Sequence, residues 1–267
     1  MKVLFPYLVI PCIFIMKYFV EKNSIARQIW GKSDTVLFIF AGAAAEFALN
    51  KAVDWLYFTG KLPADPLGRL FSTVGYARRI VFAEYDEALR NIDSITAIHK
   101  GVEDKRGKSI PDWAYRDVLF MLIHYSIASF EALEHKLSPL EKEEIFDVFF
   151  RVGQRMNIKD LPQNYTEWLA VREYDLEHDL KKTSYSMDLY QQYKKHLGLF
   201  RYRVLLEGQI IIVPQKVRDL LHFRKFSFLS PILPLYKLSR LLRLDGLIKS
   251  LILPAEYKKE IKELDMA

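Results

Sequence analysis

Two histidines lie inside strongly apolar helical sequence, where they could do chemistry. His99 completes an apolar stripe that recurs at helical spacing from Leu89 to Val102, and His124 lies within the run VLFMLIHYSIA. An imidazole in such a place is either a hydrogen-bonded core residue or, when neutral, a ligand for a metal such as haem iron. Spacing alone leaves both interpretations open for each histidine.

A second pair of polar side chains opens an otherwise apolar helix. The segment DPLGRLFST, residues 65–73, starts with an N-cap acceptor followed by proline, a strong helix-start signal. Arg69 and Thr73 follow four residues apart and therefore share one face of that helix. Taken alone, Arg69 would suit a buried ion pair, with Asp54 or Glu84 as its candidate partner.

Several other kinds of site are excluded by missing motifs. The chain has no G-x-G-x-x-G, G-x-x-x-x-G-K, G-x-S-x-G or H-E-x-x-H segment. None of the six histidines has a glutamate three residues before it, so the paired Glu-x-x-His of di-iron bundles is absent as well. A single cysteine, Cys12, rules out an internal disulfide and any Cys-based cluster.

The elements that must position these residues are mostly helices. Of 267 residues, 51% are hydrophobic and only 11 are Gly and 11 Pro, which favours helices over many short strands. One stretch, QIIIVP at 209–214, could form a short strand. The pattern predicts helices at 24–31, 34–60, 65–84, 85–104, 114–136, 138–157, 164–180 and 186–200. In the second of these, small residues at 41–45 would allow close packing against a neighbouring helix or a flat ligand.

Both ends of the chain have sequence patterns that are typical of segments bound at a membrane surface. Residues 216–249 hold eight Lys/Arg against two acids, interleaved with apolar runs, and account for the whole net charge of +6. This pattern fits a membrane-interface segment or a basic helical tail packed on the domain. Residues 3–16 are apolar but shorter than the ~20 residues that span a bilayer, which favours an interfacial anchor or a buried first helix.

Three segments carry a family resemblance, at residues 64–102, 120–133 and 137–158. They resemble the family of haem-dependent oxygenases that includes the bacterial latex-clearing protein (rubber oxygenase) and the fungal ER-bound oxygenase MpaB. The shared pattern is D-P-x-x-R-x-x-x-T, then I-H-x-x-V about thirty residues later, then a histidine in an apolar helix. Its members here are Asp65, Pro66, Arg69, Thr73, Ile98, His99, Val102 and His124.

This resemblance implies an all-α, globin-like fold that holds haem b between helices. It makes His99 the proximal ligand of the haem iron, Arg69 and Thr73 residues of the haem pocket with catalytic roles, and His124 a residue behind the first layer of contacts. Ser72 stands where the rubber enzyme has a lysine, which argues against rubber as the substrate. Asp54 or Glu46 are the candidates to replace that enzyme's acid–base glutamate.

The resulting division of the chain has three parts. Residues 1–33 form an apolar N-terminal segment and possible membrane anchor, 34–180 the haem-binding core, and 181–267 a basic, amphipathic helical region of the same domain. The resemblance implies oxidation or cleavage of a C=C bond in an isoprenoid or unsaturated lipid by dioxygen. The charge and apolar patterns at the two ends predict a membrane-associated, otherwise cytoplasmic protein without nucleic-acid partners. The alternative is a non-catalytic, membrane-associated helical protein that binds haem or lipid; a purely structural helical domain is a third reading.

Overall fold

The computed structural model describes residues 17–60, 64–241 and 246, and across them every regular element is a helix. Two isolated bridges, Tyr18 to Glu84 and Asn50 to Leu180, are the extended pairings of this part of the chain. The expected all-α class is therefore confirmed. In chain order the helices are α1 (Ile25–Trp30), α2 (Ser33–Phe47), α3 (Val53–Phe58), α5 (Pro66–Val81), α6 (Tyr85–Arg106), α7 (Asp112–Leu133), α8 (Pro139–Arg155), α9 (Tyr165–His178), α10 (Ser184–Ile212), α11 (Gln215–Leu221) and α12 (Leu233–Leu241).

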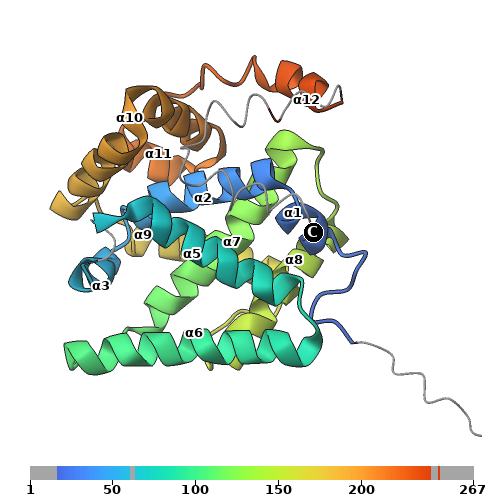
Figure 1. Cartoon of the computed structure of the whole chain (residues 1–267), viewed down its shortest axis with the longest axis vertical. Helices are drawn as coiled ribbons and strands as arrows, with labels where there is room; N and C mark the ends of the chain where they lie inside the picture. Colours follow the sequence, from blue (N-terminus) through green and yellow to red (C-terminus); the bar gives the residue numbers. More distant parts are fainter. Residues whose placement is uncertain (1–16, 61–63, 242–245, 247–267) are drawn as a thin grey trace, which may run out of the picture.

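The centre of the fold is the pair formed by α2 and α7, which cross the middle of the molecule (Figure 1). Gly42 of α2 makes this packing possible, because a Cβ there would lie 2.2 Å from the ring of Tyr125 on α7. At this glycine, the small residues of α2 thus pack against a neighbouring helix. The core around the pair is continuous from α1 to α11 and includes the fully buried Trp30 and Trp168.

The α5–α6 hairpin lies along one side of this centre, with α6 forming the lower edge in Figure 1. Asp65 caps α5 as expected, since its side chain accepts a hydrogen bond from the backbone N–H of Gly68 at 2.8 Å. At the other end α6 closes on Gly107, which has the positive φ of 66° that favours glycine. These two signals fix the start and the end of the hairpin that carries the predicted site.

Two expectations about the elements are wrong. The helix expected over 34–60 is broken between α2 and α3, because the Asn50 side chain accepts a hydrogen bond from Ala52 N at 2.8 Å and donates to Asp117 at 2.6 Å. Residues 209–212 of the expected strand are the end of α10, where Gln209 donates to the carbonyl of Ala41 at 3.1 Å. In both places a contact distant in sequence overrides the local pattern.

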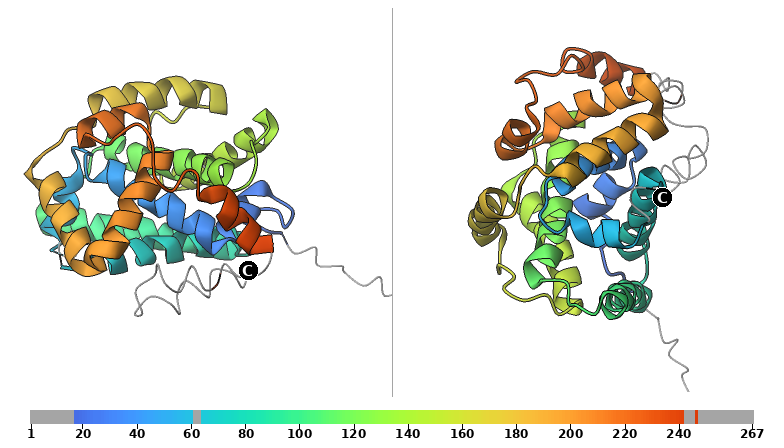
Figure 2. Two further views of the ribbon diagram at one scale, coloured as in Figure 1. Left: turned by 90° about the horizontal axis from the view of Figure 1, so that it is seen from above. Right: turned by 90° about the vertical axis from the view of Figure 1, so that its left-hand side faces the viewer.

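The ends of the described chain pack on the central helices. Phe19, Val20 and α1 belong to the main core, and α10 contacts α2, α5 and α7. Figures 1 and 2 show α10, α11 and α12 gathered on the side of α2 that lies away from α6. No helix among the described residues is long and apolar enough to cross a membrane. The apolar segment 3–16 lies outside the described residues, and the three-part division of the chain stays a prediction.

Candidate active site

The α5–α6 hairpin brings Arg69 and His99 to the same level of the fold. Arg69 lies 12 residues before the end of α5, or about 18 Å along its axis, and His99 lies 14 residues after the start of α6, or about 21 Å. Because the two helices run antiparallel and are joined by three residues, these distances place the side chains opposite each other. The positive charge of Arg69 accordingly acts on the His99 imidazole.

Arg69 and Thr73 contact each other, as their spacing predicts. The guanidinium Nη1 donates to the Thr73 hydroxyl at 2.9 Å, and that hydroxyl donates to the Arg69 carbonyl at 3.2 Å. Burial lowers the pKa of Arg69. An arginine guanidinium nevertheless keeps its charge in proteins. The two bonds hold a partly desolvated cation in one orientation.

Arg69 makes no ion pair with any carboxylate of the described residues. The expectation that Asp54 or Glu84 would pair with it is wrong. Asp54 instead accepts a hydrogen bond from Arg106 at 2.6 Å. A cation that is partly buried without an acidic partner is costly, so its charge is available to an anionic or polar ligand.

His99 is half-buried, and its Nδ1 is shielded from solvent without a hydrogen-bond partner in the part of the chain that the structure describes. Burial, reinforced by the nearby charge of Arg69, lowers the pKa of His99 to about 4. The imidazole is therefore neutral at pH 7, which is the protonation state that a metal ligand requires.

An aromatic and carboxylate wall stands behind His99. The ring of Tyr115, near the start of α7, meets the imidazole edge-on with 5.1 Å between centroids. Its hydroxyl donates to Glu103 at 3.3 Å, and Glu103 also accepts from the backbone of Ile110 at 2.8 Å. Sequence analysis missed both residues, although Glu103 lies one helical turn after His99 and its spacing could have indicated it.

Asp54, on α3, is bound at the end of the face of α6 that carries His99. Its partner Arg106 follows His99 by seven residues, two turns on or about 10.5 Å along the axis. The Arg106 guanidinium also stacks over the ring of Trp55 at 3.9 Å. Trp55 belongs to a small apolar cluster with Val102 and residues at the start of α7. Asp54 is therefore at the rim of this region and already engaged in an ion pair.

A second polar group lies at the centre of the core, apart from the hairpin. Arg172 of α9 donates two hydrogen bonds to Glu46 of α2, at 2.6 and 2.5 Å, and Tyr125 of α7 donates a third at 2.9 Å. Glu46 and Tyr125 are fully buried and Arg172 is 4% exposed. We call Arg172, Glu46 and Tyr125 together the central ion pair, after the two opposite charges among them. Glu46, a candidate acid–base residue, has its oxygens taken up by these donors.

His124 belongs with the central ion pair. It lies nine residues after Tyr115, two and a half turns along α7, and so points to the opposite side of that helix. Burial, with a contribution from the charge of Arg172, lowers the pKa of His124 to about 4. The structure thus brings Arg69, Thr73 and His99 together and places His124 elsewhere, while Ser72 of α5 is exposed.

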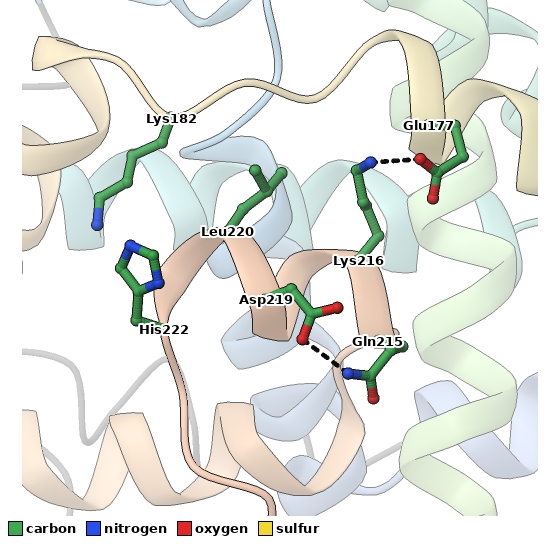
Figure 3. A pocket seen from close by; sticks show the side chains of 7 residues that line it. All are labelled: Glu177, Lys182, Gln215, Lys216, Asp219, Leu220 and His222. Atoms are coloured by element: carbon green, nitrogen blue, oxygen red, sulfur yellow. Dashed lines mark hydrogen bonds and ion pairs between the residues drawn. The ribbon is translucent and has the colours of Figure 1, made fainter.

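A polar depression of about 460 Å³ lies on another part of the surface, between the end of α9 and α11 (Figure 3). An ion pair of Lys216 with Glu177 and a hydrogen bond of 2.7 Å from Gln215 to Asp219 occupy much of its wall. None of the residues predicted from the sequence lines it. The complete lining is Glu177, Lys182, Gln215, Lys216, Asp219, Leu220 and His222.

Comparison with known families finds one that covers most of the chain. Residues 28–244 match the family described as ER-bound oxygenase mpaB/B'/Rubber oxygenase, catalytic domain. The chain belongs to this oxygenase family, and it is an enzyme of the oxidoreductase type. No curated protein and no solved structure matches it.

The residues around His99 fit a haem group. They supply a neutral imidazole with an unpaired buried nitrogen, a cation free of acidic partners, a hydroxyl, and an aromatic wall. Haem needs an axial ligand, a flat apolar surface and a cationic partner for its propionates. The central ion pair lacks such a free cation, because both charges there are already matched.

Proposed function

We propose that the protein is a haem b-dependent oxygenase that oxidises or cleaves a C=C bond of an apolar, isoprenoid or lipid substrate. One observation carries this proposal: His99 is neutral with an unpaired buried nitrogen, and it lies opposite the unpaired cation Arg69. Within a family of oxygenase catalytic domains, that combination indicates where the cofactor is held.

In this proposal each side chain of the hairpin has one task. His99 would hold the haem iron through its neutral imidazole, and a haem bound there would supply the binding and activation of dioxygen. Arg69 binds a propionate or orients a polar group of the reactants, and Thr73 fixes its guanidinium through the 2.9 Å hydrogen bond. Tyr115 and Glu103 hold the imidazole in position from the other side.

The substrate side is formed by apolar helices. Trp55, Val102 and Trp113 meet beside the hairpin, and they join α3, α6 and the start of α7 into one apolar surface. Such a surface excludes water and binds a hydrocarbon chain, but it offers few groups for a polar substrate. Asp54, at the rim of that surface, is the residue placed to exchange protons if its pair with Arg106 opens.

A membrane surface is the proposed source of this substrate. Phe226 and Phe228 are each 72% exposed and Leu235 is 66% exposed, all in the segment that connects α11 to α12 or in α12 itself. Lys225 lies over the ring of Phe226, at 5.6 Å from its centroid. Large apolar side chains beside cations bind an anionic lipid surface. Sedimentation with phosphatidylcholine vesicles containing phosphatidylserine tests this, with F226S/F228S expected to weaken binding.

The absorption spectrum of the protein purified from haem-supplemented cells tests the proposed function. We expect a Soret band in the wild-type protein and consumption of dioxygen with an isoprenoid or unsaturated lipid. Wild-type protein that folds but contains no haem would contradict the proposal.

One observation favours a second candidate, a haem- or lipid-binding protein without catalysis. Ser72 is exposed and Glu46 is held by Arg172, so neither supplies a free acid–base group to the hairpin. A protein with a Soret band that consumes no dioxygen with any such substrate would establish this alternative.

A further inference from the structure

Three aspartates on two helices meet at one point away from the hairpin face that carries His99. One carboxylate oxygen from each of Asp117, Asp175 and Asp179 lies within 4.8 Å of the other two. Asp117 is on α7, Asp175 is on α9, and Asp179 follows the end of α9. Asp117 and Asp175 are 2% and 1% exposed.

The positive charges around this group do not balance it. Arg116 binds Asp175 through two hydrogen bonds of 3.2 and 3.1 Å, which neutralises one carboxylate. Arg172 is committed to Glu46, and the ammonium of Lys51 donates to the carbonyl of His178. Neither Asp117 nor Asp179 forms an ion pair with a cation of the described residues. Two carboxylates are thus left together, one of them buried.

One oxygen atom of this group is unsatisfied. Oδ2 of Asp117 accepts a hydrogen bond from Asn50 at 2.6 Å, but Oδ1 is shielded from solvent and has no hydrogen-bond partner among the described residues. A buried acceptor with no donor is rare in proteins and costs free energy, so a missing partner is the simplest account.

We propose that Asp117, Asp175 and Asp179 bind an oxygen-preferring divalent cation of the Ca²⁺ or Mg²⁺ class. The spacing suits such an ion, because two oxygens on opposite sides of Ca²⁺ are separated by about 4.6–5.2 Å and neighbouring ones by less. An all-oxygen ligand set is the kind these cations select. Water completes the coordination on the half-buried side of Asp179.

The cation has a structural role in this proposal, separate from the proposed oxygenase chemistry. Asp117 carries the hydrogen bond to Asn50, which sets the break between α2 and α3, while Asp175 and Asp179 end α9. An ion bound to all three joins α9 to α7 and, through Asn50, to the segment before α3. We expect it to stabilise this corner of the fold whether or not haem is present.

Thermal unfolding of the full-length protein tests the site. The chain is treated with a chelator, dialysed at pH 7.5, and unfolded with increasing Ca²⁺, Mg²⁺ or Mn²⁺ added singly. We expect a saturable rise in melting temperature with at least one ion, and one Mn²⁺ per chain by electron paramagnetic resonance. Asp179→Asn and Asp117→Asn should each remove the response.

The control is Asp93→Asn, which removes an exposed carboxylate paired with Arg155 and should leave the cation response unchanged. If Asp117→Asn fails to fold, Asp179→Asn, at a half-buried position, still decides the matter. The inference is overturned if no cation raises the melting temperature of the wild-type protein. It is also overturned if Asp93→Asn and Asp179→Asn reduce the response equally.

Discussion

The hairpin site and the central ion pair contain similar side chains but differ in whether the charge of the arginine is matched by a carboxylate. In the centre, the carboxylate of Glu46 receives three hydrogen bonds, and its charge is matched by Arg172. At the hairpin, Arg69 has a hydroxyl but no carboxylate of the described residues as a partner. Among the described residues, one buried ring nitrogen of His99 and one of His124 are each without a hydrogen-bond partner, so the difference lies in the arginines. Both regions hold a desolvated arginine beside a histidine whose pKa is lowered to about 4.

This difference distinguishes buried charges that hold helices together from a buried charge that is available to a ligand. Buried charges that satisfy one another contribute to a specific packing. Removing one partner leaves the other as an unpaired buried charge, which is costly. A buried polar group without a partner costs free energy, and such groups are candidates for binding a ligand. The proposed function accordingly assigns binding to the hairpin, whereas the central ion pair joins α2, α7 and α9.

The largest effect should come from breaking the central ion pair. Arg172→Met leaves the buried Glu46 carboxylate without its cation, and we expect a loss of about 3–5 kcal/mol in the free energy of unfolding. Urea unfolding of the haem-free protein measures it. Arg155→Met, which breaks an exposed pair with Asp93, is the matched control and should cost much less. Equal losses in the two variants would remove the distinction drawn above.

Lowering the pH should reduce the free energy of unfolding through His124, the buried histidine beside the central ion pair. His124 has a pKa of about 4 in the folded protein and an ordinary value near 6.5 when unfolded, so the unfolded chain takes up its proton first as the pH falls. Stability should decline by up to about 3 kcal/mol between pH 6.5 and pH 4 from this residue.

The test compares the pH dependence of the free energy of unfolding in His124→Asn with that in the wild-type protein. That variant should show a flatter slope than the wild-type protein over this range. His196→Asn, at an exposed position, is the control and should keep the wild-type slope. An unchanged slope in His124→Asn would show that the imidazole is not buried in its neutral form.

The packing of α2 on α7 can be tested with two glycines. Gly42→Ala puts a Cβ against the Tyr125 ring and should destabilise the protein by about 1–3 kcal/mol. Gly101→Ala lies in open space on α6 and should stabilise it by about 0.5–1 kcal/mol. Denaturant midpoints of the two variants should shift in opposite directions, and a shift in the same direction would contradict the close approach.

The smallest effect is expected at Glu103. Glu103→Gln keeps an oxygen for Tyr115 and the Ile110 backbone, so the free energy of unfolding should change by less than about 1 kcal/mol. The haem spectrum should persist with a small displacement of its bands. Complete loss of haem in this variant would mean that Glu103 does more than position the imidazole.

Local signals predicted much of this arrangement from the sequence. Asp65 and Ser138 cap α5 and α8 where their types and spacing indicate, and four-residue spacing put Arg69 beside Thr73. The apolar stripe of α6 with one polar gap singled out His99, and its role as a haem ligand stays a prediction.

Contacts between distant residues could not be predicted in this way. Arg172 and Glu46 are 126 residues apart, and neither position has a local pattern that indicates its partner. The break at Asn50 depends on Asp117, and the helical state of 209–212 depends on packing that includes the contact of Gln209 with α2. The same limit explains why the three aspartates were missed.

Haem titration of the apoprotein tests the central claim most directly. Wild-type protein and His124→Asn should both develop a Soret band that saturates at one haem per chain, whereas His99→Ala should develop none while remaining folded by circular dichroism. A Soret band that survives in His99→Ala but is lost in His124→Asn would place the cofactor at the central ion pair and contradict the account.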